Sequence, residues 1–369
     1  MGPNTAVQYK LLNNVNYAAH GPVKGWSWGN SSTAAPNSYV RVFDLDGRIA
    51  SYNLGNPLTT GTTRTLTYDA ASRIKAYTHT SSGAGINAGA LNQTFGYDDA
   101  DQLASYSGNG TSQGFKYDPS GNRTQLTIGS ATYTNSIAAT SNRVASTTGP
   151  AAKKTNSYDL SGNLKSDATV TYTYSAQSRM SAAKNGATVS SYLYNGIGQR
   201  VRQIASTQTA NPFGILVYDE SGQIIGEYDT STGKATREYI YLGATLVGVL
   251  EDVLTGTAPN QVHVTNLIYA YTDHLNTPRI LARSSDNKIV WRWDNGDPFG
   301  VIPPNENPSA AGQFKLNLRM PGQYFDSTTN LFYNYFRDYD PQLGRYIQSD
   351  PIGLAGGINT YAYVGSLSH

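Results

Sequence analysis

A short pattern of apolar and polar positions recurs along most of the chain. It consists of an aromatic residue, Asp or a small polar residue, two further residues, Gly or Ser, a polar residue and an apolar run. Clear copies begin at Phe43 (FDLDGRIASY), Tyr68 (YDAASRIKAY), Tyr97 (YDDADQLASY), Tyr117 (YDPSGNRTQL) and Tyr158 (YDLSGNLKSD), and weaker copies begin at Tyr174 (YSAQSRMSAA), Tyr194 (YNGIGQRVRQ) and Tyr218 (YDESGQIIGEY). The copies follow one another at roughly twenty residues, which is typical of an array of stacked units.

Each unit is predicted to be a β-hairpin. Residues with alternating faces lead into the turn, and the Asp side chain can accept a hydrogen bond from the backbone two residues further on. A tight hairpin turn also needs a positive φ angle, which glycine adopts without strain. The turn glycines include Gly121, Gly162 and Gly222, and the outgoing strands begin with apolar residues such as Ile49, Ile74, Leu103 and Ile224.

Composition supports a β architecture. Charged residues make up only 14% of the 369 residues, and Gly occurs 37 times, whereas a helical protein of this length would be richer in Ala, Leu, Glu and Lys. Tyr occurs 28 times against 9 for Phe, which favours half-buried strands whose hydroxyl groups reach water. We therefore predict an all-β protein, an antiparallel meander of twisted hairpins, with short helical turns near residues 303–313.

Charge and cysteine content exclude several function classes. The 27 basic and 25 acidic side chains give a net charge of +2 without a long run of one sign, so no nucleic-acid footprint is expected. There is no cysteine, which excludes disulfides and thiolate metal sites. The first residues lack the apolar segment of a secretion signal, and no stretch has the length of a membrane span. If the protein is exported, we expect the export signal to lie outside this chain.

The repeats and the last third of the chain resemble the YD repeats and the core of the Rhs family, which includes bacterial polymorphic toxins, C components of insecticidal toxin complexes, and teneurins. The phrase HGPVKGWSWGNSS from His20 resembles the GPxxxxxxGNG opening of such repeats, with Ser31 in place of its last glycine. More specific is the ordered series DHLNTPR, WRWDNGDPFG, PGQYFD and YNYFRDYDPQLGRYIQSDPIGLAGG within residues 269–300 and 317–365. The resemblance implies a β strip that spirals into a hollow shell, with repeats over residues 1–261 and a core that winds as a plug over residues 262–369.

In toxin members of the family, the core acts as an intramolecular aspartyl protease. By position in the RxYDP and DPxGL phrases, the resemblance implies catalytic roles for Arg337 and Asp350. The second catalytic aspartate belongs to a later DPxGL phrase, and this sequence reaches His369 without one. Because an aspartyl protease needs two carboxylates that share a proton, the chain as given is expected to be inactive as a protease.

The neighbouring carboxylates have simpler interpretations. Asp340, followed by Pro341 and Gly344, is predicted to begin a turn, and Asp338 is predicted to be a surface strand residue. Arg337 is expected to hold Asp350 ionised, an arrangement that also suits a structural salt bridge, and Asp350 with Pro351 and Gly353 also reads as a turn.

Other tempting residues are likewise assigned to structure. Asp273 and His274 are predicted to shape a turn into Pro278 rather than a base or metal site, and the DLDG stretch at Asp44 a hairpin rather than a calcium loop. The pairs Trp26 with Trp28 and Trp291 with Trp293 form WxW, which places both rings on one face of a strand. They are expected to fill the inner face of the strip, although such pairs can also stack on a sugar. GxxxxGK does not occur, and no cofactor or metal is expected.

Three functions follow as hypotheses. The first is a non-enzymatic encapsulation module, the C-terminal part of an Rhs shell that houses or plugs around a toxin in bacterial competition or insecticidal delivery. The second is a self-cleaving aspartyl protease that releases a downstream toxin, and the third is an extracellular module that recognises glycans or proteins. The expected partners are a toxin polypeptide or another shell subunit, and open sheet edges favour a partner subunit or self-association. The expected location is bacterial, with export or delivery by a secretion system.

Overall fold

The computed structural model describes residues 11–19, 21–29, 37–83, 85–206, 214–257 and 260–363. His20 and Ser31 of the predicted opening phrase, and the end of the chain after Tyr363, lie outside these ranges. The protein is all-β, as predicted, and it consists of two large antiparallel sheets and one small sheet. No helix in the described ranges is long and apolar enough to span a membrane.

The first sheet has 13 strands that pair in chain order. They are β1 (Leu12–Tyr17), β2 (Val23–Trp28), β3 (Ser38–Phe43), β4 (Ile49–Leu54), β5 (Thr62–Tyr68), β6 (Ile74–Thr80), β7 (Gln93–Tyr97), β8 (Leu103–Gly108), β9 (Thr111–Tyr117), β10 (Arg123–Ile128), β11 (Ala131–Ile137), β12 (Val144–Thr148) and β13 (Lys154–Thr155). A 3-10 helix, η1 (Ala88–Leu91), lies between β6 and β7.

The second sheet also has 13 strands in chain order. They are β14 (Ser157–Tyr158), β15 (Leu164–Ser166), β16 (Val170–Tyr174), β17 (Met180–Asn185), β18 (Thr188–Tyr194), β19 (Arg200–Ala205), β20 (Ile215–Tyr218), β21 (Ile224–Tyr228), β22 (Ala235–Leu242), β23 (Thr245–Thr255), β24 (Val262–Thr272), β25 (Pro278–Arg283) and β26 (Ile289–Arg292). Only Asn156 separates this sheet from the first, and its backbone N–H donates to the carbonyl of Ala145 at 2.9 Å. The two sheets therefore form one strip.

The remaining elements belong to the C-terminal segment. The small sheet contains β27 (Tyr324–Asp326), β28 (Leu331–Asn334), β29 (Arg337–Asp340) and β30 (Arg345–Tyr346), followed by the 3-10 helix η2 (Gly353–Gly356). Residues 303–313 contain no helix, so the helical turns predicted there are wrong. This stretch is instead tied to β26 by a bridge between Arg292 and Asn305. The division between repeats and core predicted at residue 262 stays a prediction, and β24, which begins there, pairs with β23 in the same sheet.

The predicted hairpins are confirmed, and tyrosine hydroxyls join many of them to the hairpin before. In the turn at Asp69, the carboxylate oxygen Oδ1 accepts backbone hydrogen bonds from Ala71 and Arg73, both at 2.9 Å. The hydroxyl of Tyr97 then donates to the carbonyl of Ile74, the sixth residue after the preceding tyrosine, Tyr68. The same offset recurs in the pairs Tyr68 with Ile49, Tyr117 with Leu103, Tyr174 with Leu164, Tyr194 with Met180, Tyr218 with Arg200 and Tyr241 with Ile224. The repeated aromatic residue thus links neighbouring units.

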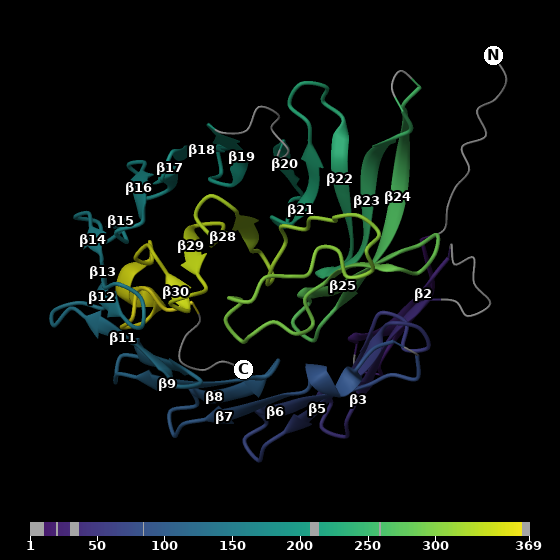
Figure 1. Cartoon of the computed structure of the whole chain (residues 1–369), viewed down its shortest axis with the longest axis horizontal. Helices are drawn as coiled ribbons and strands as arrows, with labels where there is room; N and C mark the ends of the chain where they lie inside the picture. The colour runs from purple at the N-terminus through teal and green to yellow at the C-terminus, as the bar shows by residue number, and fades with distance from the viewer. Residues whose placement is uncertain are drawn as a thin grey trace.

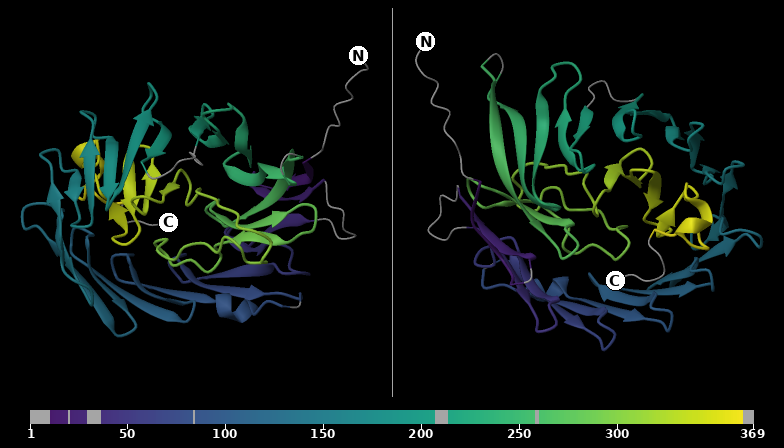
Figure 2. Two further views of the ribbon diagram at one scale, coloured as in Figure 1. Left: turned by 45° about the horizontal axis from the view of Figure 1, so that its top comes forward. Right: turned by 180° about the vertical axis from the view of Figure 1, so that it is seen from behind.

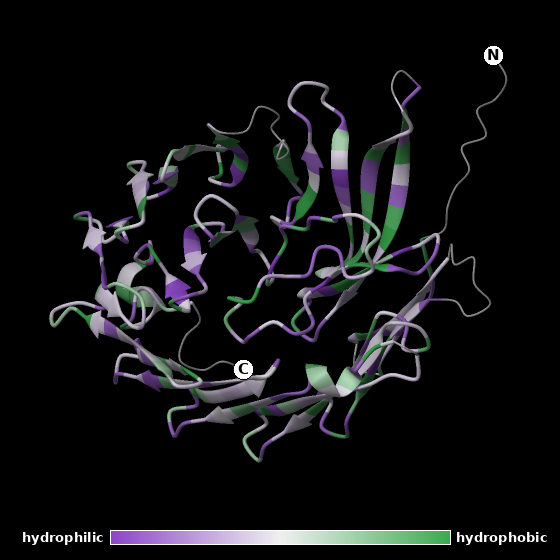
Figure 3. Ribbon diagram, viewed as in Figure 1, coloured by the Kyte–Doolittle hydropathy of each residue, from purple (hydrophilic) through white to green (hydrophobic). Residues whose placement is uncertain are grey.

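The strip runs once around the molecule, and the C-terminal segment lies inside this circuit (Figure 1). The views of Figure 2 agree that β27 to β30 and the loops before them lie within the curve of the strip. Apolar and polar residues alternate along the strands (Figure 3), which gives each sheet one face that packs against the interior. The described part of the chain therefore forms a small shell with a plug, rather than a closed barrel.

The beginning and end of the strip meet at a seam, which we define as the contact of β2 to β5 with β23 to β26. The two sets of strands share one buried apolar cluster, and no strand pairing joins them in the described ranges. The indole N–H of Trp28 donates to the carbonyl of Val247 at 2.8 Å, and the hydroxyl of Tyr39 donates to the carbonyl of Thr272 at 2.8 Å. Side-chain packing and a few hydrogen bonds therefore close the circuit.

Candidate functional site

The structure brings the two predicted site residues together. The Arg337 guanidinium lies 2.9 Å from Oδ2 of Asp350, and the two side chains are 15% and 16% exposed. Arg337 projects from β29 with its guanidinium carbon 3.8 Å from the centre of the Tyr346 ring on β30. Burial lowers the pKa of Arg337, while Tyr346 and Asp350 act in the opposite direction. The arginine is thus fixed between an aromatic ring and a carboxylate.

Backbone contacts fix Asp350 in a turn, as predicted. Its Oδ1 accepts a hydrogen bond from the N–H of Ile352 at 3.0 Å, and its carbonyl accepts one from Gly353 at 2.9 Å. Its own N–H donates to the carbonyl of Thr360 at 2.7 Å, which ties the turn to the following segment. Asp350 is therefore both a turn residue and a partner of Arg337, and its two carboxylate oxygens are engaged on opposite sides.

The prediction that Asp338 is a surface strand residue is wrong. Its side chain is only 4% exposed, and Oδ1 lies 2.8 Å from the guanidinium of Arg200 on β19. The amide of Gln348 donates to Oδ2 at 2.7 Å and accepts from the backbone N–H of Asp338 at 2.7 Å. A buried carboxylate needs such partners, since desolvation without them is strongly unfavourable. Asp338 faces inward because β29 lies inside the strip, where both faces of the strand are covered.

Arg200 is the main charged contact between the strip and the plug. It also lies 3.7 Å from Asp326 on β27, and its guanidinium is sandwiched at 4.1 and 4.2 Å from the rings of Tyr192 and Tyr333. The hydroxyl of Tyr192 donates to Asp326 at 2.5 Å. These contacts place β29, and with it Arg337, relative to the wall.

A second buried acidic residue joins the strip to the plug. Glu227 on β21 is fully buried and accepts hydrogen bonds from the hydroxyls of Tyr239 and Tyr324 at 2.6 and 3.0 Å. Tyr324 lies on β27, and Arg237 on β22 lies 3.7 Å from the carboxylate. The plug is therefore held by buried polar contacts at two places on the second sheet.

Asp340 begins a turn, as predicted. Its Oδ1 accepts a hydrogen bond from Gln342 at 2.8 Å, and its carbonyl accepts one from Gly344 at 2.7 Å. Burial raises the pKa of the Asp340 carboxyl to about 6, and nearby Asp167 adds to the rise. A carboxyl with this pKa exchanges protons near neutral pH, but the hydrogen bonds of its Oδ1 come from its own turn, and no hydrogen bond in the described ranges joins it to Asp350.

The other assignments to structure are confirmed. Asp44 accepts backbone hydrogen bonds from Asp46 and Arg48 in its hairpin. Asp273 accepts them from Leu275 and Thr277 and lies 2.8 Å from Arg279. All four tryptophans, Trp26, Trp28, Trp291 and Trp293, are at most 2% exposed and pack in the interior, so their rings are not free to stack on a sugar. The described ranges contain no group of three or more His, Asp or Glu side chains placed to hold a metal ion.

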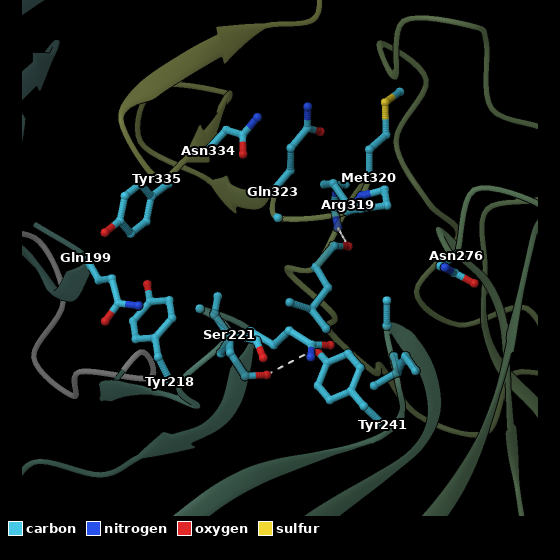
Figure 4. A pocket seen from close by; sticks show the side chains of 18 of the residues that line it. Gln199, Tyr218, Ser221, Tyr241, Asn276, Arg319, Met320, Gln323, Asn334 and Tyr335 are labelled. Atoms are coloured by element: carbon cyan, nitrogen blue, oxygen red, sulfur yellow. Dashed lines mark hydrogen bonds between the residues drawn. The ribbon is translucent and has the colours of Figure 1, made fainter. Parts of the chain in front are cut away.

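Two cavities lie between the strip and the plug. The smaller, of about 490 Å³, is shown in Figure 4, where Gln199, Tyr218 and Tyr241 of the strip face Gln323 and Tyr335 of the plug. Its tyrosine hydroxyls are engaged internally, as in the bond from Tyr335 to the carbonyl of Ile197. The larger cavity, of about 960 Å³, lies between β10 to β17 and residues 300–343.

Sequence reasoning missed Arg200 and another buried arginine, Arg123, which lines the larger cavity. Both occupy the position six residues after the repeat tyrosine, in YDPSGNR and YNGIGQR. Other repeats have an apolar residue there, such as Ile74 or Leu103. Departure from the repeat pattern was therefore a signal that could have identified these interior charges.

The family model of the teneurin YD-shell matches residues 38–353. The chain belongs to the teneurin YD-shell family. The resemblance of this YD-shell to Rhs proteins is also confirmed. Toxin protein Tse5 of Pseudomonas aeruginosa is 40% identical to it over 98 residues, or 26% of this chain and 7% of the toxin. The probable deoxyribonuclease RhsA of Dickeya dadantii is 51% identical over 49 residues, or 13% of this chain and 3% of that protein.

The fold of the YD-shell is similar to that of a solved toxin complex. It superimposes on the crystal structure of TcdB2-TccC3 with a TM-score of 0.69 at 18% identity, covering 96% of this chain and 19% of that one. The YD-shell thus spans less than a fifth of the length of each of these proteins.

Proposed function

We propose that the chain is a structural encapsulation module, the C-terminal part of an Rhs shell that houses or plugs around a toxin polypeptide. The observation that supports this most directly is the complete circuit of the strip around the C-terminal segment, closed by the seam (Figure 1). A wall of paired strands leaves few unsatisfied backbone groups inside, so it can separate an interior from solvent. The similarity to proteins named as toxins supports a role beside a toxin.

The proposed partners are a toxin polypeptide, another shell subunit, or a second copy of the chain. The proposed setting is a bacterial protein that is exported or delivered in competition or insecticidal attack. The two cavities between wall and plug are the interior space that a guest segment would enter. Tyr363, the last described residue, contacts the rings of Tyr339 and Tyr346 inside the circuit, so a polypeptide that follows it would start from the interior.

Protease protection tests this proposal. A flexible tail with a protease site is fused after His369, and the matched control carries the same tail before Met1. We expect the C-terminal tail to be cut at least about ten-fold more slowly, because the wall restricts access to it. Equal cutting rates with an intact shell would contradict encapsulation.

The second candidate function is self-cleavage by an aspartyl protease, which the Arg337–Asp350 pair favours. The pair supplies one fixed carboxylate, and the reaction needs a second carboxylate to share its proton. The test extends the chain through a further DPxGL phrase and separates the products on a gel. A cut that Asp350→Asn abolishes, with the melting temperature unchanged, would support the protease. An uncut band would leave the scaffold function alone.

A further inference from the structure

Two arginines from distant parts of the chain line the larger cavity. Arg123 begins β10 in the strip, and Arg319 lies just before β27 in the plug. Their side chains are deeply buried, with residue exposures of 7% and 4%. The cavity of about 960 Å³ thus has one arginine on its wall side and one on its plug side.

Neither arginine forms an ion pair with a carboxylate in the described ranges. Arg123 donates to the carbonyl of Gln342, its Nε has no hydrogen-bond partner, and the guanidinium lies 4.6 Å from the ring centre of Phe299. Arg319 donates from Nη1 to the carbonyls of Leu316 and Leu318 at 2.6 and 3.0 Å. Both cations therefore have aromatic rings and carbonyl oxygens around them, and the nearby carboxylates, Asp340 and Asp297 for Arg123 and Glu306 for Arg319, act on them without ion-pair contact.

Three other buried arginines, Arg64, Arg200 and Arg345, either have a carboxylate partner or lie away from the larger cavity. Arg200 has a carboxylate partner, Asp338 at 2.8 Å. Arg64 and Arg345 have none, but each is held by at least two neutral hydrogen-bond acceptors, and neither lines either of the two cavities described above. Arg123 and Arg319 alone among these five combine the lack of a carboxylate with access to the large cavity.

Burying a cation without a contacting carboxylate is unfavourable, and burial lowers the pKa of both groups, that of Arg319 to about 10, although nearby carboxylates act in the opposite direction. The carboxylates that also line the cavity are engaged elsewhere. Asp167 lies 3.9 Å from Lys154, Glu306 accepts a hydrogen bond from Gln313, and Asp340 accepts from its own turn. An incoming carboxylate would therefore gain a charge-assisted contact that no residue of the described chain supplies.

We propose that the larger cavity binds a carboxylate-bearing segment of the enclosed polypeptide, with Arg123 and Arg319 as its anchors. This inference rests on the proposed encapsulation. A peptide is favoured over a small inorganic anion because much of the remaining wall is apolar and suits a chain with aliphatic groups. The apolar lining residues include Leu126, Ile128, Val301, Leu331, Phe332 and Leu343.

The test titrates the full chain with a short fluorescent peptide rich in glutamate, and with the same peptide in which glutamine replaces each glutamate. Anisotropy is measured at low and high salt, with inorganic phosphate as a competitor. We expect the glutamate peptide to bind about ten-fold or more tightly than the glutamine peptide, since charge-assisted hydrogen bonds are worth about 1.5–3 kcal/mol. The difference should shrink at high salt.

Variants assign the effect to the two arginines. Arg123→Met and Arg319→Met should each weaken binding of the glutamate peptide about ten-fold and leave the glutamine peptide unchanged. The matched control is Arg283→Met, at a surface pair with Asp286 away from the cavity, which should change neither. Thermal melts confirm that each variant is folded, and Arg123→Gln replaces Arg123→Met if the latter is not.

Three results would overturn the inference. The first is equal affinity for the two peptides, and the second is no saturable binding of the glutamate peptide. The third is that phosphate displaces the glutamate peptide completely and binds as tightly as the peptide does, so that the apolar wall adds no affinity. A chain that protects its C-terminal tail from protease but shows no preference for glutamate would overturn this inference while leaving encapsulation intact.

Discussion

Trp28 and Val247 are 219 residues apart in sequence and joined by one hydrogen bond of 2.8 Å, from the indole N–H to the backbone carbonyl. Trp28 also stacks on Tyr269, with ring centres 4.9 Å apart. These contacts bring β2 against β23 and β24 and so complete the circuit of the strip. The seam is therefore a specific junction and not an incidental contact.

Removal of the Trp28 N–H should weaken the seam. Trp28→Phe leaves the carbonyl of Val247 without that donor, so we expect it to lower the free energy of unfolding by about 1–3 kcal/mol more than its control. The control is Trp291→Phe, because Trp291 is equally buried but its N–H has no partner. Urea denaturation of both variants checks this. Equal losses would show that the hydrogen bond adds nothing to the packing.

Loss of Arg200 should release the plug from the wall. Arg200→Met leaves Asp338 buried without its cation and is expected to cost about 3–5 kcal/mol. Arg283→Met breaks an exposed pair with Asp286 and should cost at most about 1 kcal/mol. Because the circuit itself is held elsewhere, we expect limited proteolysis of Arg200→Met to cut first between residues 300 and 363. A first cut within the strip would argue against this account.

Asp340 should destabilise the protein at neutral pH. Its folded-state pKa is raised from 3.8 to about 6, so the folded state binds the proton more tightly than the unfolded chain. Stability is therefore lost as the pH rises from about 4 to about 6, and the loss is complete above that range. Asp340→Asn removes the titration while its side-chain oxygen can still accept from Gln342. We expect this variant to be about 1–2 kcal/mol more stable at pH 7.5, with the gain fading below pH 6.

Thermal melts over this pH range check the prediction. Asp286→Asn is the control, because its expected effect on stability at pH 7.5 has the opposite sign. The hydrogen bond from Arg283 lowers the pKa of Asp286, so this carboxylate stabilises the fold above its ordinary pKa, and the contribution is lost as the pH falls through its folded value. Asp286→Asn should therefore be slightly less stable at pH 7.5. A pH-independent effect of Asp340→Asn would rule out the titration.

The link between neighbouring hairpins should depend on the tyrosine hydroxyl. Tyr97→Phe removes the bond to the carbonyl of Ile74 but keeps the ring that lies over Arg73, and we expect it to cost about 0.5–1.5 kcal/mol. Tyr269→Phe is the control, because the Tyr269 hydroxyl is buried without a partner. Hydrogen exchange should show the loss as faster exchange in β6 to β8 only. A uniform change across the strip would contradict a local link.

The strip was predictable because its information is local. The aromatic residue, the Asp and the glycine of each repeat determine a turn within a few residues, and Gly121 and Gly162 have the positive φ angles that the pattern requires. The position of the tryptophan pairs also followed, since WxW places both rings on the buried face. The Arg337–Asp350 contact was foreseen through the family motif, at a sequence separation short enough for a turn to bring the residues together.

The interior charges could not be predicted in the same way. The burial of Asp338 depends on Arg200, which lies 138 residues earlier and reaches it only because the strip curves back over β29. A strand with Arg, Asp and Tyr in succession is predicted from sequence to have one exposed face, because the sequence does not show that the strip covers it. Arg123 and Arg319 likewise meet at one cavity only in three dimensions. The curvature of the strip, which no single repeat encodes, determines these contacts.

The seam has a consequence for how contents could leave. Because no ladder hydrogen bond crosses it among the residues that the structure describes, β2 to β5 can move away from β23 to β26 while every strand keeps its neighbours. Uncoiling of the ribbon would then be a sub-global event with a barrier lower than that of full denaturation. Under the proposed encapsulation, release of an enclosed polypeptide would require no unfolding of the wall, only the separation of one set of side chains from another.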